Sequence, residues 1–347
     1  MSLNIILTGD INLMNVTDPD VPFRKVIKEF QAADAVLSNF ECCLYEPPGQ
    51  HSVDTAEGFY ANPQVGGEAL KRAGIHAVGI ANNVNYGDAA ITASIAQLDK
   101  FGIPHSGAGK DRAAARAPVI VERNGVRIGF MQRTSVYWPT NHEAGATAPG
   151  VAVIRGHTAY QLPLHKTRPD VPPANRPGIP PEILTWPDAK HLQLFKDDVA
   201  ALRKQCDILV ASCHWGLHKD VLDYMPMIAH AAIDSGADIV MGHGPHFPLP
   251  IEFYKDKPIY YGLGMCCFIR SNKKAHRGWT GMAGHLTFDN KTLTETAFSI
   301  VRQNDATEVL FSAPQGEGEA IARIERLCQP FGTTVRVDGS KVIVATA

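Results

Sequence analysis

The sequence lacks the features of several large protein classes. None of its apolar runs reaches the roughly 18 residues that a membrane-spanning helix needs. Its 33 lysines and arginines face 35 aspartates and glutamates, so a formal charge of -2 leaves no basic excess for nucleic acid. Residues 1–4 lead straight into an apolar run, without the basic region of a secretory signal. We therefore expect a cytoplasmic protein with neither membrane nor nucleic-acid partners.

The seven cysteines do not match a disulfide framework. Their number is odd, and two pairs are adjacent in the sequence, Cys42-Cys43 and Cys266-Cys267. No spacing matches a structural zinc site. One interpretation is that the thiols are buried and inert. The other is that the two adjacent pairs line a pocket, because they flank polar segments at predicted strand ends.

Two common catalytic arrangements are also missing. No serine lies in the glycine pattern of a nucleophile elbow, and no glycine-rich loop suited to a phosphate group is present. We find no internal repeat. At 347 residues the chain can bury a large core, and its length alone suggests one large domain or two modest ones.

Short apolar runs alternate with helical patterns along the first 150 residues. Helical spacing at 68–73 and 91–101 ends at Gly74 and Gly102, which are suitable C-terminal glycines. An Asn-Gly pair at 124–125 is a strong hairpin signal. This alternation predicts an α/β fold with mixed sheets. The strand-like runs that precede polar segments are 4–7, 35–37, 77–80, 208–211, 239–241 and 258–260.

The composition of the chain changes after residue 155, where prolines become frequent. Prolines recur so densely between 155 and 186 that neither a regular helix nor a central strand is expected there. The length and the cationic residues of this segment suggest a lid over the site, with a surface excursion as the alternative. We expect a main domain at 1–303, with the lid-like insertion at 155–190, and a small appended α+β tail at 304–347.

Polar segments follow each of the six strand-like runs. Because α/β proteins place their sites at the carboxyl edge of a sheet, we expect these segments to converge there. Two carboxylates, one amide and three imidazoles form a donor set suited to Mn²⁺, Zn²⁺ or Fe²⁺. The candidate metal ligands are Asp10, Glu41, Asn83, His214, His243 and His246.

Each candidate also has an ordinary structural explanation. An isolated Asp10 is typical of a helix N-cap, Asn83 of a turn, and a single histidine of the core or the surface. The joint set is what favours a metal site. A carboxylate such as Glu41 can bridge two ions about 3.5–4 Å apart, and such a pair activates water. We expect one or two divalent ions, with Asp10, Glu41 and His214 as catalytic residues.

Together the segments resemble the CapA family, the poly-γ-glutamate capsule biosynthesis proteins of the calcineurin-like metallophosphoesterase superfamily. The resemblance covers roughly residues 4–135 and 192–300, and its motifs occur in the family's order. It implies a four-layer α/β/β/α sandwich with mixed sheets and a metal site at the strand ends, with the six candidates as ligands. The motifs that carry it include Gly9-Asp10, Asn39-Phe40-Glu41, Ala81-Asn82-Asn83, His214-Trp215-Gly216, Gly242-His243 and Pro245-His246.

Three departures from the family pattern bear on the chemistry. Val84 stands where the family has a histidine that would contact the transition state, so the general acid is not assigned. The run Gly242-His243-Gly244 stands where the family has two adjacent histidines. Gly264-Met265-Cys266 stands where the family has Gly-Asn-Phe.

The resemblance and the residues support three functions. The leading one is a metal-dependent hydrolase of an amide, lactam or ester of a small carboxylate or γ-glutamyl-type compound. The alternatives are a phosphomonoesterase or phosphodiesterase, and a non-catalytic accessory protein of capsule polymer synthesis. We expect a small anionic substrate, and the sequence leaves a homo-oligomer open. The candidate substrate-binding residues are Asn82, Trp215, Cys266, Arg270 and Lys273.

Overall fold

The structure is a computed structural model that describes residues 2–47, 60–140, 142–161, 182–268 and 280–347. Its centre is a pair of β-sheets. The larger sheet has ten strands in the order β21-β22-β19-β18-β1-β2-β5-β6, with β17 paired to β1 and β20 paired to β19. Its strands are β1 (Ser2–Asn12), β2 (Ala35–Phe40), β5 (Ala77–Gly79), β6 (His105–Ser106), β17 (Met265–Phe268), β18 (Gly281–Asp289), β19 (Thr292–Gln303), β20 (Val309–Ser312), β21 (Thr333–Asp338) and β22 (Lys341–Thr346).

The smaller sheet has six strands in the order β15-β16-β14-β13-β9-β8. Both sheets are mixed: β1 is parallel to β2 and antiparallel to β18, whereas β13 is parallel to both β9 and β14 and the edge pairs are antiparallel hairpins. The strands of the smaller sheet are β8 (Val119–Arg123), β9 (Val126–Thr134), β13 (Ile208–His214), β14 (Ile239–His243), β15 (Ile251–Tyr254) and β16 (Lys257–Tyr260).

Three further pairs of short strands lie outside the two sheets. The pair of β11 (Gly156–Gln161) and β12 (Glu182–Pro187) is the described part of the proline-rich insertion, and residues 162–181 lie outside the described residues. The lid function of this insertion stays a prediction. The other pairs are β3 (Cys43–Leu44) with β4 (Tyr60–Ala61) and β7 (Ala108–Gly109) with β10 (Gly150–Val151).

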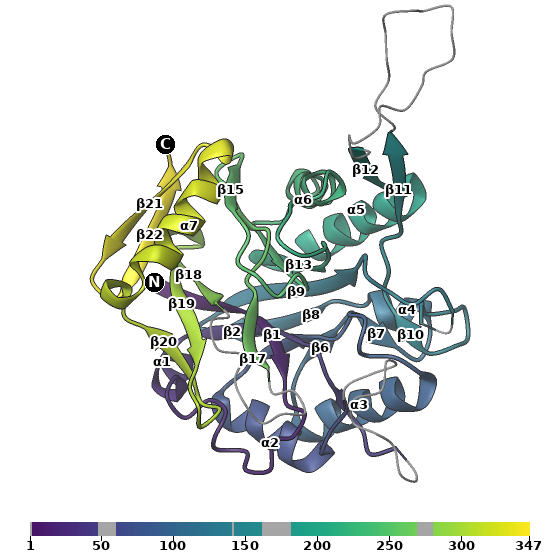
Figure 1. The fold of residues 1–347 in the computed structure, drawn as a ribbon. Helices are drawn as coiled ribbons and strands as arrows, with labels where there is room; N and C mark the ends of the chain where they lie inside the picture. Colours follow the sequence, from purple (N-terminus) through teal and green to yellow (C-terminus); the bar gives the residue numbers. More distant parts are fainter. Residues whose placement is uncertain (1, 48–59, 141, 162–181, 269–279) are drawn as a thin grey trace, which may run out of the picture.

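Helices cover the outer faces of both sheets, as Figure 1 shows. Residues alternate between the two faces of β1, so that Leu7 packs against the smaller sheet while Ile6 packs with the first helices. The layers are therefore helix, sheet, sheet, helix, and the predicted α/β class with mixed sheets is confirmed. The larger sheet is covered by α1 (Ile27–Ala32), α2 (Pro63–Ala73) and α3 (Asp88–Phe101), and the smaller sheet by α5 (Ala189–Arg203) and α6 (Tyr224–Asp234).

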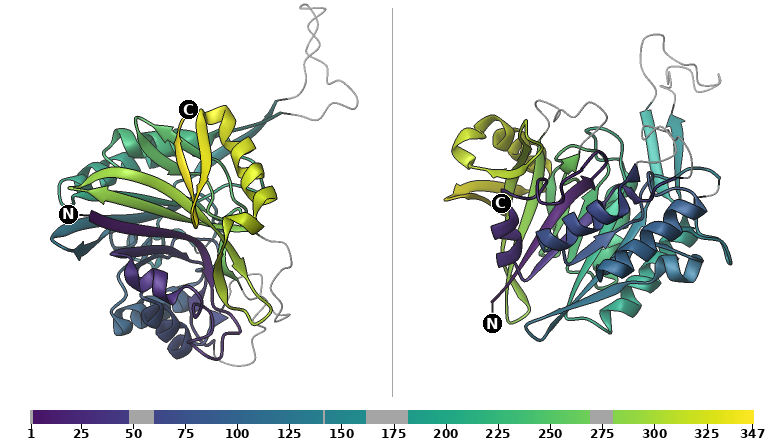
Figure 2. Two further views of the ribbon diagram at one scale, coloured as in Figure 1. Left: turned by 90° about the vertical axis from the view of Figure 1, so that its left-hand side faces the viewer. Right: turned by 90° about the horizontal axis from the view of Figure 1, so that it is seen from below.

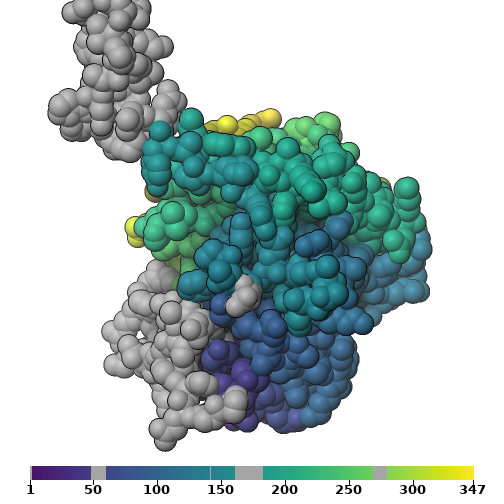
Figure 3. All heavy atoms as spheres, turned by 90° about the vertical axis from the view of Figure 1, so that its right-hand side faces the viewer, coloured from purple at the N-terminus to yellow at the C-terminus, as the bar shows by residue number. Residues whose placement is uncertain are grey.

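Several local signals in the sequence are confirmed. Gly74 and Gly102 follow α2 and α3 in the left-handed conformation, and the Asn-Gly pair at 124–125 turns between β8 and β9. The short helix α4 (Arg112–Arg116) lies beside β7 and β10, on the face of the molecule seen in Figure 3. Among the described residues, no helix is both long and apolar enough to cross a bilayer.

The residues after 303 extend the larger sheet, as Figure 2 shows. Strands β20 and β22 both pair with β19, and α7 (Gly318–Cys328) packs beside β15. Ile324 from α7 and Val344 from β22 belong to the core between the two sheets. The short helical turns η1 (Pro314–Gly316) and η2 (Gln329–Phe331) flank α7. The division into a domain at 1–303 and a tail at 304–347 stays a prediction.

Candidate metal centre

A distortion near the end of β1 positions Asp10. The pairing of β1 with β2 shifts its register between Thr8 and Asp10, which is the mark of a β-bulge. Gly9 in this bulge lies so close to β17 that a Cβ atom would come within 1.8 Å of the Gly264 carbonyl oxygen, so no larger residue fits. The Asp10 amide donates to that same oxygen at 2.9 Å. The bulge thereby aims a fully buried carboxylate into the space between the sheets.

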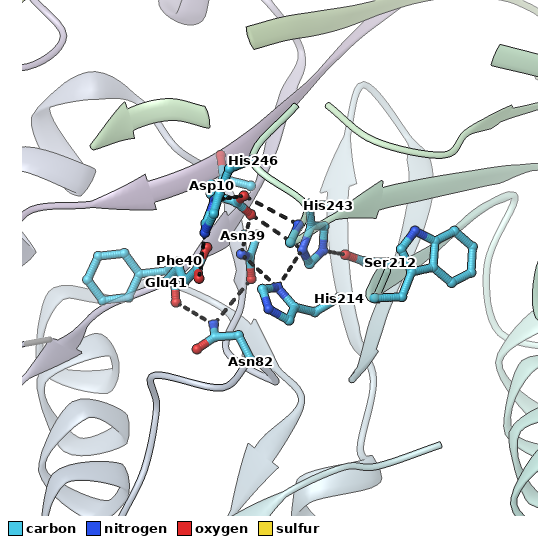
Figure 4. A network of polar contacts seen from close by, with 12 residues as sticks. Asp10, Asn39, Phe40, Glu41, Asn82, Ser212, His214, His243 and His246 are labelled. Carbon is cyan, nitrogen blue, oxygen red and sulfur yellow. Dashed lines mark hydrogen bonds and ion pairs between the residues drawn. The ribbon is translucent and has the colours of Figure 1, made fainter. Parts of the chain in front are cut away.

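Asp10 belongs to two groups of potential metal ligands. One group is Asp10 with His214 and His243, and the other is Asp10 with Glu41 and His246. In each group the ligand atoms lie within 4.8 Å of one another. Figure 4 shows these side chains pointing toward a common centre. Each group could hold a metal ion, and Asp10 is the residue that both groups share.

The first group comes from neighbouring parallel strands. His214 ends β13 and His243 ends β14, and the two residues are paired in register. Their Nδ1 atoms lie 3.1 Å apart, and Nδ1 of His243 is 3.6 Å from Oδ1 of Asp10. Two ring nitrogens and a carboxylate oxygen lie close together here. A cation bound between them would accept a lone pair from all three atoms.

The second group reaches the surface. His246 Nδ1 lies 2.9 Å from Asp10 Oδ2, and its Nε2 lies 3.7 Å from Glu41 Oε1. The side chain of His246 is 32% exposed, whereas those of Asp10 and Glu41 are at most 1% exposed. The turn between His243 and His246 needs a glycine at position 244. Gly244 has a φ of +109°, and a Cβ there would come within 2.9 Å of the Trp215 carbonyl oxygen. Solvent therefore reaches the centre from the side of His246.

Burial and charge set the protonation states needed for metal binding. Burial alone raises the pKa of Asp10, but the hydrogen bond from His246 and the nearby imidazoles outweigh it and hold this pKa below its usual range. Burial lowers the pKa of His243 to about 4 and that of His214 well below its usual value. At neutral pH the centre thus presents a carboxylate and neutral imidazoles, the forms that bind metal. No lysine or arginine among the described residues pairs with Asp10.

Polar neighbours orient these side chains. Ser212 Oγ lies 2.8 Å from His243 Nε2, and Asn83 Oδ1 lies 2.8 Å from His214 Nε2. Because an amide oxygen only accepts, His214 carries its proton on Nε2 and turns the Nδ1 lone pair toward the centre. Asn39 Nδ2 donates to Asp10 Oδ1 at 2.8 Å. Such partners of metal-binding histidines fix their ring orientation and tautomer.

Five of the six predicted ligands lie in the two groups, and Asn83 contacts Nε2 of His214, but one premise of the prediction is wrong. Asp10 lies in β1 of the larger sheet, and Glu41 and Asn83 follow two other strands of that sheet, whereas His214 and His243 end strands of the smaller one. The site therefore lies between the ends of two sheets and not along the edge of a single sheet. The structure also places Asp10, and not Glu41, in both ligand groups. The roles of the six residues as ligands stay predictions.

The predicted substrate-binding residues lie in different settings. Asn82 is buried and donates to Asn39 Oδ1 and the Phe40 carbonyl. Trp215 is buried in the core against α6, where its indole donates to the Tyr261 carbonyl at 2.8 Å. Cys266 is also buried. Arg270 and Lys273 lie outside the described residues. Direct contact of any of these with a substrate stays a prediction.

The cysteines follow the simpler of the two interpretations. All seven are buried and free of disulfide bonds. Burial raises the pKa of Cys213 and of Cys266 to about 12, so these thiols stay protonated and inert at neutral pH.

Ser212 and Gln132 were missed in the sequence, and Asn39 was named there only as part of a motif. Asn39 and Ser212 contact Asp10 and His243, and Gln132 Nε2 lies 3.3 Å from His243 Nε2. The missed signal was strand alternation, because Ser212 lies two residues before His214 on the same face of β13. Gln132 is paired with Ser212 across β9 and β13, a register that one sequence does not reveal.

Comparison with known proteins identifies relatives of this chain. The family model for the bacterial capsule synthesis protein PGA_cap matches residues 4–268. The chain is 27% identical to the PGA biosynthesis protein CapA of Bacillus subtilis, with 75% of this chain and 58% of that protein covered. It is 32% identical to a probable polyglutamine synthesis accessory protein of Mycobacterium tuberculosis, with 54% and 44% covered. The chain thus spans about half the length of these two relatives.

A solved structure of a phosphatase from Mycoplasma pneumoniae also matches, with a TM-score of 0.46 and 12% identity over 86% of this chain and 93% of that one. A likeness at this level says nothing about activity. The family model covers most of the chain, including every candidate metal ligand. The chain belongs to the bacterial capsule synthesis protein family, PGA_cap.

Proposed function

We propose that this chain is a metal-dependent hydrolase that directs water at an amide, lactam or ester bond of a small carboxylate, such as a γ-glutamyl compound. The observation that carries the proposal is the pair of ligand groups that share the buried Asp10. When bound, two divalent ions of the Mn²⁺, Zn²⁺ or Fe²⁺ type lower the pKa of a water ligand and polarise a substrate oxygen.

The remaining chemistry belongs to the side chains. Asp10 and the two buried histidines would hold one position, and Asp10 with Glu41 and His246 would hold the other. Ser212 and Asn83 would keep the rings of His243 and His214 turned toward the centre. Because His246 is 32% exposed and Glu41 only 1%, a substrate would approach from the side of His246. We further infer that the fold is of the metallophosphoesterase type.

The family supports the substrate class. The names of the relatives refer to capsule and poly-γ-glutamate biosynthesis, which points to glutamyl-type carboxylates. A non-catalytic accessory role is the second candidate, favoured by the name of the mycobacterial relative and by the buried Val84 in place of a family histidine. A cytoplasmic location also remains a proposal.

Metal analysis and a substrate screen test the proposal together. Protein purified without chelator is expected to contain stoichiometric Mn, Zn or Fe. A screen with Mn²⁺ should include γ-glutamyl amides, lactams, esters and phosphoesters, with Asp10→Asn as the inactive control. Turnover of phosphoesters alone would replace the proposed substrate class. Absence of both metal and turnover would favour the accessory role.

A further inference from the structure

Two adjoining cavities share part of their walls on the face of the molecule that carries α4 (Figure 3). Their volumes are about 350 and about 510 Å³. Arg112, Glu143 and Arg155 line both cavities. We call the two cavities together the arginine pocket. The other charged residues that line it are Arg116, Arg133, Asp188, Lys190 and Asp198.

The acidic residues of the arginine pocket are already committed to protein groups. Asp198 holds two guanidinium groups at once, those of Arg116 and Arg133, each at 2.6 Å. Glu143 accepts from Nε of Arg155 at 2.9 Å. Asp188 caps α5 by accepting from the His191 amide. These contacts hold Arg116, Arg133 and Arg155 in place.

The arginine pocket therefore keeps an excess of positive charge. Five cations, Arg112, Arg116, Arg133, Arg155 and Lys190, line it against three carboxylates, Glu143, Asp188 and Asp198. Arg112 and Lys190 have no ion-pair partner among the described residues. Both of these side chains are exposed and line the cavity wall, so a bound anion could reach them. Guanidinium groups match the oxygens of carboxylates and phosphates alike.

Two residues, Trp138 and Asn83, link the arginine pocket to the metal centre. Trp138 lines the larger cavity, and its Nε1–H donates to the carbonyl oxygen of Asn83 at 2.8 Å. The side chain of Asn83 in turn faces His214 Nε2 at 2.8 Å. A molecule with an anionic end in the pocket would extend past Trp138 toward the centre.

We propose that the arginine pocket binds an anionic group of the substrate, a carboxylate or a phosphate, at a distance from the bond that is broken at the metal centre. This rests on the proposed hydrolase function and adds to it a recognition site. Binding energy gained from a remote group positions the reacting bond, so it acts on catalysis as well as on affinity. Preferred substrates then carry a second anionic group away from the scissile bond.

Binding is tested on the full chain after chelation, so that metal does not capture the probe. Glutarate and inorganic phosphate are titrated in separate arms while NMR follows the indole N–H signals of the four tryptophans. A Trp138→Phe variant assigns the signal of Trp138. We expect a saturable shift of that signal, and the arm that produces it identifies a carboxylate or a phosphate.

Two variants and one control make the binding test decisive. Arg112→Ala and Lys190→Ala each remove one unpaired cation and should weaken binding about tenfold. Arg336→Ala, which removes an exposed arginine of β21, should bind like wild type. If neither probe shifts the Trp138 signal, or if both pocket variants bind with unchanged affinity, the pocket proposal is wrong.

Kinetics separate this proposal from the hydrolase proposal. Two substrates are compared that differ only in a distant carboxylate, free in one and methylated in the other. Arg112→Ala should raise KM for the free acid about tenfold and leave the methyl ester unaffected. If neither compound nor any other substrate is hydrolysed, the hydrolase proposal fails while the binding result stands. If hydrolysis needs metal but Arg112→Ala has the same KM as wild type for both compounds, the pocket proposal alone fails.

Discussion

Asp10 and Glu41 have similar sequence contexts but different positions in the centre. Each follows a strand-like run, so the sequence offered no basis for choosing which carboxylate is shared, and Glu41 was the predicted bridge. The bulge at Gly9 places Asp10 in both ligand groups, whereas Glu41 belongs only to the group with His246. The choice depended on a register shift, which residue spacing does not encode.

Removing each carboxylate should therefore have a different effect on metal content. Asp10→Asn weakens both ligand groups, so we expect loss of both ions and at least a ~100-fold fall in activity. Glu41→Gln weakens only one group and should retain the ion held by His214 and His243. Elemental analysis of the purified variants gives the stoichiometry, with the surface variant Asp20→Asn as control. Equal metal loss in the two variants would contradict Asp10 as the shared residue.

Ser212 offers a test of how the histidines are oriented. Its hydroxyl is 2.8 Å from His243 Nε2, and Ser212→Ala should lower metal affinity by about 10- to 100-fold. Ser299→Ala is a matched control, since Ser299 makes a similar 2.9 Å contact with His285. His285 lies on β18 opposite Ile6 of β1, and not opposite Asp10. Competition with a fluorescent chelator measures both affinities. If the two variants lose affinity equally, Ser212 has no specific orienting role.

Elements were easier to predict than their partners. Apolar runs, C-terminal glycines and the Asn-Gly turn located most of the long strands and helices, because these signals act within a few residues. The assignment of strands to two sheets was not predictable, since it depends on pairing between distant segments. For the same reason the polar cluster was expected at one sheet edge. Two-residue strands such as β6 and β7 also carry too little pattern to detect.

The loop after β9 supports the centre through a neutral histidine. His142 Nδ1 accepts from the Trp138 amide at 2.9 Å, and its Nε2 donates to the Asn85 carbonyl at 3.0 Å. Burial lowers the pKa of His142 from 6.5 to about 4. Between these two pH values the unfolded chain binds a proton that the folded chain excludes, so stability falls as the pH falls through this window. Through His142 alone, the free energy of unfolding should fall by on the order of 3 kcal/mol across this window.

Chemical unfolding of the chelated protein between pH 7 and 4.5 measures this dependence. His142→Gln cannot take up the proton and should show a shallower loss of unfolding free energy than wild type. His218→Gln changes an exposed histidine and should keep the slope of wild type. A slope for His142→Gln equal to that of wild type would show that His142 does not contribute.

At the scale of the whole molecule, the last 44 residues contribute to the core that holds the two sheets together. Ile324 is 1% exposed, so Ile324→Ala should cost about 2–5 kcal/mol of unfolding free energy. Val337 is 44% exposed, so Val337→Ala should change it by less than about 0.5 kcal/mol. Urea unfolding of the two variants compares them directly. A small effect of Ile324→Ala would support the predicted division at residue 303.

The position of β1 in the middle of the larger sheet has a consequence for synthesis on the ribosome. β2 follows β1 closely in the chain, but β18, which pairs with the other edge of β1, is made much later. The two candidate ligands Asp10 and His246 are 236 residues apart in the chain. At a translation rate of about 5–20 residues per second, Asp10 waits roughly 10–50 s for this partner. During that time one edge of β1 is open to other chains, and metal cannot yet be captured by the complete set of ligands.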